Sequence, residues 1–290
     1  MIRTALRRAL CLSLLGLFAT VAGCAPADLL NRTVDRAGLS EQRDVAYGPL
    51  PRQAMDVWRP AEGVARLPVV VFFYGGSWQT GRRADYSFVA ADLARRGHVV
   101  VLPDYRLYPE VRFPVFLQDA AAAVATARRM ATSWGGDPAR VVLMGHSAGA
   151  HIATMLALDP RWLAAVGDSR DGLAGVIGLA GPYDFLPITG RGIRAVFAGA
   201  ADPRDTQPIS FADRHAPPTL LLHGIDDTTV FPRNSQALAD RIRGDGGRAE
   251  LRLYGGVGHI GIVLGFARLF RDLAPVLDDS AAFIASLPPR

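Results

Sequence analysis

The residues that most clearly point to chemistry are a serine, a histidine and an aspartate, each placed after an apolar run. Ser147 lies in the pattern Gly-x-Ser-x-Gly, between Gly145 and Gly149, directly after the apolar residues 141–144. A strand followed at once by this pattern and by a helix predicts a nucleophile elbow, a sharp turn that exposes the serine hydroxyl. The two glycines supply the room that such a strained turn needs. We therefore predict that Ser147 is a nucleophile at the N-terminus of a helix.

His259 is the residue whose type and place suit a general base for this serine. A serine hydroxyl is a weak nucleophile until a neighbouring base takes its proton, and an acid must orient that base. In the chain order that accompanies the elbow, the acid follows the serine and the histidine comes last. Of the six histidines, only His259 lies in a loop after the last expected strand, among several glycines. We therefore predict that His259 is the base.

Two adjacent carboxylates compete for the role of the acid. Asp226 and Asp227 follow the apolar run 219–223, so both lie where a strand is expected to end. Only one of them can face the imidazole. Asp184, after the preceding apolar run, is a more remote candidate, for which stabilisation of a turn is the better interpretation.

Backbone N–H groups are expected to donate the hydrogen bonds that stabilise the negative charge on a substrate oxygen. Gly75 and Gly76 follow the apolar run 69–74 and allow the backbone to turn its amides inward. In folds with a nucleophile elbow, the oxyanion hole combines the amide after the nucleophile with amides from a loop after an earlier strand. The predicted donors are therefore the N–H groups of Gly76, Ser77 and Ala148.

These residues need a scaffold, and the apolar pattern predicts one in which strands and helices alternate. Short runs that are apolar throughout are typical of strands buried on both faces of a parallel sheet. After an opening β-hairpin over 47–60, the expected strands are 69–74, 99–103, 141–144, 173–179, 219–223 and 249–253. The expected helices are 87–96, 114–132, 148–158, 234–243 and 266–285. This alternation predicts an α/β fold with a doubly wound, mostly parallel sheet, and the interval 180–218 is too short for a large lid domain.

The composition limits the classes of partner and of chemistry. The chain has 290 residues, is 50% hydrophobic and is expected to bury one large core. Its net charge is +5, but the arginines are interspersed with acids, and no basic run with interleaved aromatics indicates nucleic-acid binding. All 32 basic residues are arginine, which excludes lysine nucleophiles and a P-loop lysine. Both cysteines lie near the N-terminus, and no cluster of ligand residues predicts a metal site or a cofactor.

The N-terminal residues carry the pattern of an export signal. Arginines precede an apolar stretch over 9–22 that is short for a transmembrane helix, and Cys24 follows Val21-Ala22-Gly23. This ending resembles the lipobox of bacterial lipoproteins, in which the cysteine is lipidated and becomes the new N-terminus. An ordinary cleaved signal and an uncleaved anchor are the alternatives.

The chain is accordingly expected to divide into three parts. These are a lipoprotein signal peptide over 1–23, a tether over 24–45 that is lipidated at Cys24, and an α/β catalytic domain over 46–290. We expect the protein to be exported and to face the periplasm from a membrane. The residue after the cysteine is alanine rather than aspartate, which, by the resemblance to bacterial lipoproteins, favours the outer membrane over the inner one.

Together these motifs resemble the α/β-hydrolase superfamily. Within it, the chain is similar to the esterase branch that includes hormone-sensitive-lipase-like and feruloyl-esterase-like carboxylesterases and kynurenine formamidases. The resemblance extends over residues 46–290, and the matching segments are 74–78, 104–110, 136–140, 145–151, 181–184, 223–227 and 258–259. The segment His223-Gly-Ile-Asp-Asp227 assigns the acid to Asp227 rather than to Asp226. The family usually has a histidine where Tyr74 stands, and the resemblance implies no metal and no organic cofactor.

The activity that the resemblance and the motifs predict is hydrolysis of a small carboxylic ester. Ser147 is expected to attack, His259 to carry the proton and Asp227 to orient His259. An arylformamidase or another amidase with the same triad is the alternative among enzymes. A catalytically silent, membrane-tethered binding protein on the same fold is the alternative of another class, which the presence of serine, histidine and acid disfavours.

Overall fold

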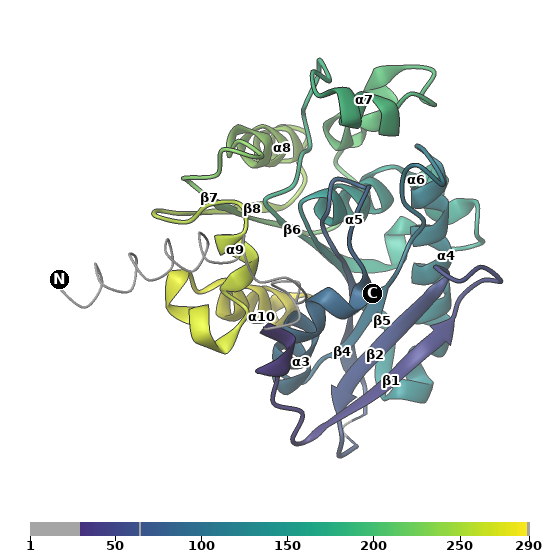
Figure 1. The fold of residues 1–290 in the computed structure, drawn as a ribbon, viewed down its shortest axis with the longest axis vertical. Coiled ribbons are helices and arrows are strands. Elements are labelled where there is room, and N and C mark those ends of the chain that lie inside the picture. The colour runs from purple at the N-terminus through teal and green to yellow at the C-terminus, as the bar shows by residue number, and fades with distance from the viewer. Residues whose placement is uncertain (1–29, 64, 289–290) are drawn as a thin grey trace, which may run out of the picture.

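An eight-stranded sheet forms the centre of the protein in the computed structural model, which describes residues 30–63 and 65–288. Figure 1 shows how the elements are arranged around this sheet. The strand order is β1-β2-β4-β3-β5-β6-β7-β8. β1 pairs antiparallel with β2, and β2 with β4, while the remaining neighbours are parallel. The strands are β1 (Leu39–Ala46), β2 (Ala54–Pro60), β3 (Leu67–Phe73), β4 (Val99–Pro103), β5 (Gly136–His146), β6 (Leu173–Leu179), β7 (Thr219–Gly224) and β8 (Ala249–Tyr254). The predicted doubly wound, mostly parallel sheet is confirmed.

Helices cover both faces of the sheet (Figure 1). Side chains alternate along a strand, so Val70 and Phe72 of β3 point into one apolar cluster while Val71 and Phe73 point into another. α3 and α10 pack on the first face, and α4 and α5 pack on the second, where α8 also lies. The helices are α3 (Ser87–Arg95), α4 (Val115–Met130), α5 (Ala148–Leu158), α6 (Pro160–Ala164), α7 (Arg191–Val196), α8 (Arg233–Gly244), α9 (Gly261–Leu264) and α10 (Val276–Ser286). Short 3-10 helices lie at Arg83–Tyr86, Ala131–Trp134, Arg170–Gly172, Pro203–Thr206, Pro208–Phe211 and Arg268–Leu273.

The prediction of one continuous helix over 266–285 is wrong. The structure has a 3-10 helix at Arg268–Leu273 and then α10 at Val276–Ser286. Pro275 separates them because it lacks an N–H group and restricts the residue before it, and Ala274 is extended, with φ −162° and ψ 148°. The apolar periodicity continues across the break, which is why it suggested one helix.

The boundary expected between the tether and the folded domain also needs correction. The segment 24–45 was expected to be a tether, but its last residues form strand β1, which pairs with β2 at the edge of the sheet. β1 is also the first arm of the opening hairpin, which therefore begins before residue 47. Its side chains are mostly exposed or half-buried, so backbone pairing rather than apolar burial supports this strand. For that reason its sequence has no apolar pattern from which a strand could be predicted.

The signal peptide predicted over 1–23 and Cys24 lie outside the described residues. Within residues 30–63 and 65–288, no helix combines the length and apolar character needed to cross a membrane. Between β6 and β7 the described chain holds only α7 and two 3-10 helices, in agreement with the expectation that there is no large lid domain.

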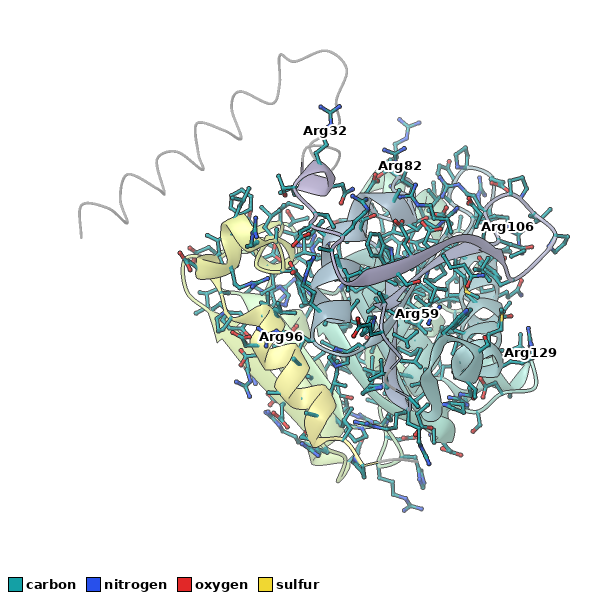
Figure 2. The ribbon with its side chains drawn as sticks, turned by 90° about the horizontal axis from the view of Figure 1, so that it is seen from below. Arg32, Arg59, Arg82, Arg96, Arg106 and Arg129 are labelled. Carbon is teal, nitrogen blue, oxygen red and sulfur yellow. The ribbon has the colours of Figure 1, made fainter. Side chains whose placement is uncertain are left out.

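The arginines that produce the positive charge are distributed over separate elements. Figure 2 labels, among others, Arg96 beyond α3, Arg106 beyond β4 and Arg129 in α4. Several arginines pair with carboxylates, as Arg106 does with Asp119 at 2.8 Å and Arg96 with Asp278. The positive charge around such pairs is balanced locally.

Candidate active site

The side chains predicted to do chemistry gather at one edge of the sheet. Ser147 follows β5, Asp227 follows β7 and His259 follows β8. Because β5, β6, β7 and β8 are consecutive parallel neighbours, the loops after their C-terminal ends meet at the same edge. This is where sites lie in open α/β sheets.

Ser147, His259 and Asp227 form one chain of hydrogen bonds. The Oγ of Ser147 lies 2.9 Å from Nε2 of His259, and Nδ1 of His259 lies 2.7 Å from Oδ2 of Asp227. The carboxylate can only accept, so Nδ1 donates to it, and Nε2 of the neutral ring keeps a lone pair for the serine proton. The His259 side chain is 11% exposed and Asp227 is 2% exposed. The histidine is therefore reachable from solvent, while the carboxylate is shielded.

The turn that carries Ser147 is strained and crowded. Ser147 has φ 55° and ψ −121°, and its N–H donates to the carbonyl oxygen of Leu179 at 2.9 Å. A Cβ on Gly145 would lie 2.3 Å from the carbonyl carbon of Gly149, and a Cβ on Gly149 would lie 2.0 Å from the carbonyl oxygen of Phe73. Only glycine fits at either position, in agreement with the expectation from the Gly-x-Ser-x-Gly pattern.

Four donors converge on the carboxylate of Asp227. Oδ1 accepts the N–H groups of Thr229 and Val230, each at 2.9 Å, and Oδ2 accepts from Nε2 of His223 at 3.2 Å as well as from His259. Burial by itself would raise the pKa of Asp227, but the hydrogen bonds from His223, His259 and Val230 outweigh it and hold that pKa well below its usual range. The carboxylate thus stays ionised beside the imidazole.

The other acids considered from the sequence do not contact the imidazole. Asp226 is exposed, although it directly precedes Asp227. Asp184 is also exposed, and its backbone N–H donates to Oδ1 of Asn234 at 2.9 Å. Of the three acids, the structure brings only Asp227 against His259.

His223 is a functional residue that the sequence analysis missed. It is fully buried, and its Nε2–H donates to the carbonyl oxygen of Val230 at 2.8 Å as well as to Asp227. Its Nδ1 lies 2.7 Å from the hydroxyl of Ser235 and accepts that proton. His223 therefore holds the acid loop in place. The signal in the sequence was a histidine that ends an apolar strand four residues before the acid.

The three amides predicted to bind an oxyanion are available. No residue within the described part of the chain accepts a hydrogen bond from the N–H groups of Gly76, Ser77 or Ala148. Gly76 has φ 122°, and a Cβ there would lie 2.2 Å from the carbonyl oxygen of Thr80. Ser77 has φ 54°, a strained conformation of the kind that is found at functional sites. Ala148 begins α5, so its N–H lacks an intrahelical partner and lies at the positive end of the helix dipole.

Tyr74 stands where the esterase branch usually has histidine, and its hydroxyl is hydrogen-bonded to an arginine. It accepts a hydrogen bond from Nη1 of Arg52 at 3.0 Å, and the same guanidinium donates to the carbonyl oxygen of Gly81. The ring of Tyr74 stacks on that of Tyr105, with 4.5 Å between centroids, and the hydroxyl of Tyr105 donates to the carbonyl oxygen of Tyr74 at 2.8 Å. Tyr74 therefore packs as part of the scaffold, and no sequence pattern pointed to Arg52.

A cavity of about 300 Å³ opens beside the acid loop, between the loop after β6 and the residues that follow Asp227. Its lining mixes apolar rings, Phe185 and Phe231, with polar side chains such as Thr229 and Arg233. A space of this size admits a small organic group. Within the described residues, no three His, Cys, Asp or Glu side chains are grouped in a way that would hold a metal ion.

Comparison of the sequence with known proteins identifies a matching family and several named relatives. A model of the BD-FAE family matches residues 55–242. Isoprenylcysteine alpha-carbonyl methylesterase ICME of Arabidopsis thaliana is 29% identical over 86% of this chain and 66% of its own length. Esterase LipC of Mycobacterium tuberculosis is 33% identical over 70% of this chain and 55% of its own length. The chain thus spans between about half and two thirds of the length of these relatives.

Solved structures share the fold. A truncated carbohydrate esterase from gut microbiota superposes with a TM-score of 0.75 at 22% identity, over 85% of this chain and 95% of that chain. Esterase 2 of Thermogutta terrifontis superposes with a TM-score of 0.71 at 24% identity, over 88% of this chain and 98% of that chain. At these identities the likeness concerns the fold, and the α/β-hydrolase fold expected from the sequence is confirmed.

Proposed function

Because the chain belongs to the BD-FAE family, we propose that it is a serine hydrolase that cleaves a small carboxylic ester. The observation that carries the proposal is the continuous contact from Ser147 through His259 to Asp227, with distances of 2.9 and 2.7 Å. The curated relatives support an ester as the substrate, since those compared above are named as a methylesterase and an esterase.

In the proposed reaction, the Oγ of Ser147 attacks the carbonyl carbon of the ester while Nε2 of His259 takes the hydroxyl proton. The electron pair of the carbonyl bond moves to oxygen, and the N–H groups of Gly76, Ser77 and Ala148 donate to that oxyanion. When the intermediate collapses, the alcohol leaves with the proton from His259. A water molecule then attacks the acyl-serine by the same route, which releases the acid and restores Ser147.

The contacts of Asp227 support this proton transfer. When His259 takes the proton it becomes a cation, and an ionised carboxylate at 2.7 Å stabilises it. The depressed pKa of Asp227 keeps the carboxylate charged during the transfer. The positive end of α5, beside Ser147, favours the opposite charge on the oxyanion.

A substrate panel tests the reaction class. The purified protein is assayed with acyl esters of increasing acid size, a methyl ester of an S-alkylated cysteine, and N-formyl aromatic amides. We expect hydrolysis of small esters at rates well above those of the amides. Faster cleavage of N-formyl amides would assign the protein to the amidase alternative. Failure to cleave either class, together with no labelling by an organophosphonate, would support the silent binding protein.

For the location, we propose export and anchoring by a lipid on Cys24, in the outer rather than the inner membrane. Support comes from the sequence pattern, in which a charged segment and an apolar stretch end in small residues before Cys24. A lipid anchor would hold the enzyme beside a bilayer, where apolar esters concentrate.

Intact-mass analysis of the mature wild-type protein tests this location. We expect a chain that begins at Cys24 and carries a lipid adduct on it. The Cys24→Ser variant is the control and should show no lipid. An unmodified wild-type chain that begins beyond Cys24 would instead mean simple secretion and would overturn the lipoprotein proposal.

A further inference from the structure

We propose that Tyr86 and His146 are positioning residues that align the oxyanion loop with the catalytic histidine through one continuous chain of hydrogen bonds. This inference rests on the proposed function, since it concerns the same site. Tyr86 ends the 3-10 helix at Arg83–Tyr86, and His146 ends β5 directly before the nucleophile. Neither belongs to the triad or supplies an oxyanion donor.

The hydrogen bonds join four segments around Ser147, namely the oxyanion loop, the 3-10 helix at Arg83–Tyr86, the end of β5 and the loop after β8. The N–H of Gly75 lies 3.2 Å from the hydroxyl oxygen of Tyr86, and that oxygen lies 3.2 Å from Nδ1 of His146. Nε2 of His146 lies 3.0 Å from the backbone carbonyl oxygen of His259. One continuous path of hydrogen bonds thus runs from the oxyanion loop, past the elbow, to the loop that carries the base.

The groups at the two ends of this hydrogen-bond path, the N–H of Gly75 and the carbonyl oxygen of His259, determine the direction of each hydrogen bond. The carbonyl oxygen of His259 can only accept, so His146 donates through Nε2–H and its neutral Nδ1 must accept. The hydroxyl of Tyr86 therefore donates to Nδ1, and its lone pair accepts the N–H of Gly75, which can only donate. Each of the four groups has the single role that its neighbours require.

Burial keeps these roles constant over the working pH range. His146 is 2% exposed, and burial lowers its pKa to about 3, with the nearby His259 as the next cause. Burial likewise raises the pKa of Tyr86 to about 12. The imidazole of His146 therefore stays neutral and the phenol of Tyr86 stays protonated at any pH between these two pKa values. The donor and acceptor of each hydrogen bond then keep their roles.

The geometry shows what the chain controls in the oxyanion loop. A Cβ on Gly75 would lie 3.1 Å from both Nδ1 of His146 and Cβ of Ser147, so this loop packs directly against the elbow. Tyr86 accepts the N–H of Gly75, and the next two amides, those of Gly76 and Ser77, remain for the oxyanion. The hydrogen bond at Gly75 thus holds the start of the oxyanion loop, and the two amides that follow are left free for the oxyanion.

The rings around Tyr86 and His146 make the chain rigid. The ring of Tyr86 contacts those of Phe72, at 5.4 Å between centroids, and Phe88, at 6.1 Å. The imidazole of His146 lies 5.0 Å from that of His259. With the ring packed against these neighbours, the hydroxyl of Tyr86 has little freedom, and removal of that oxygen would leave the Gly75 amide and Nδ1 of His146 without partners.

The Tyr86→Phe variant tests the proposal, because it removes one oxygen and keeps the packed ring. We expect the rate of Ser147 phosphonylation and kcat for a small ester each to fall about tenfold or more, with KM little changed, since a misplaced donor weakens only transition-state binding. The pH profile should keep its shape, since the contact between Asp227 and His259 is untouched. The matched control is Tyr183→Phe, which removes a buried tyrosine hydroxyl outside this path of hydrogen bonds, and it should react like the wild type.

A pair of substitutions at His146 separates hydrogen bonding from packing. In His146→Gln the amide can still accept from Tyr86 and donate to the carbonyl oxygen of His259, while His146→Leu fills the space without either bond. We expect the glutamine variant to retain more of the acylation rate than the leucine variant, at comparable melting temperatures. This pair decides the question if Tyr86→Phe does not fold.

The results separate this proposal from the proposed function. Wild-type rates in folded Tyr86→Phe, or equal rates for the two His146 variants, would overturn the positioning role while leaving the esterase intact. A wild-type protein that neither cleaves esters nor reacts with the organophosphonate would overturn the proposed function itself. A loss confined to KM or to thermal stability would assign Tyr86 to packing alone, and would also overturn the proposal.

Discussion

Ester hydrolysis should fall by about 10⁶-fold in the Ser147→Ala variant, because the substitution removes the nucleophile and leaves only the weak catalysis of the oxyanion donors and of substrate binding. The fold should survive. Alanine keeps the Cβ of serine, so the strain at φ 55° is unchanged, and the substitution removes the hydroxyl together with its 2.9 Å hydrogen bond to His259. Turnover is measured by release of the alcohol, and folding by circular dichroism and thermal melting.

Covalent labelling supplies the control for this variant. An organophosphonate should add one group to the wild type, and peptide mapping should find it on Ser147. The folded Ser147→Ala protein should take up none. Undiminished turnover in the variant, or a label on a different residue, would contradict the assignment of the nucleophile.

Asp227→Asn is the second substitution for which we expect a large effect, a fall in kcat of about 10³- to 10⁴-fold. The carboxylate accepts from four donors, and an amide would turn an NH₂ group toward some of them. Without a negative charge, the imidazolium of His259 is no longer stabilised, and the ring is free to adopt the wrong tautomer. Steady-state kinetics on the best ester of the panel measure the effect.

The neighbouring acid provides a matched comparison. Asp226→Asn makes the same chemical change one residue earlier, at an exposed side chain that does not contact His259. Its kcat should stay close to that of the wild type. The reverse ranking of the two variants would show that Asp226 is the acid.

Much of the fold could be predicted because the central strands are apolar runs bounded by turn residues. The strands expected at 99–103 and 173–179 agree with β4 and β6 to the residue, and the helix expected at 148–158 agrees with α5. Such runs are buried on both faces of the sheet, so burial leaves a strong local signal in composition. Where an element is held by backbone pairing rather than by burial, as β1 is, that signal is missing.

In the candidate site, too, some residues could be predicted from the sequence and others could not. Ser147, His259 and the acid loop were assigned from motifs, because each lies in the turn or loop that follows a predicted strand. The choice of Asp227 over Asp226 needed the family resemblance, and only the folded chain brings Asp227 to 2.7 Å from the imidazole. No motif pointed to Tyr86 or Arg52, whose contacts are with residues tens of positions away in the chain.

The sequence by itself determined the order of the elements, the nucleophile elbow and the loops that carry the acid and the base. These depend on short-range features, namely apolar runs and the space that only glycine leaves at positions such as 145 and 149. Only the tertiary structure decided which acid faces His259, which amides remain free, and how Tyr86 joins Gly75 to His146. A hydrogen bond between distant segments depends on where the sheet and its helices bring them, and that position is set by the packing of the whole core rather than by the residues on either side.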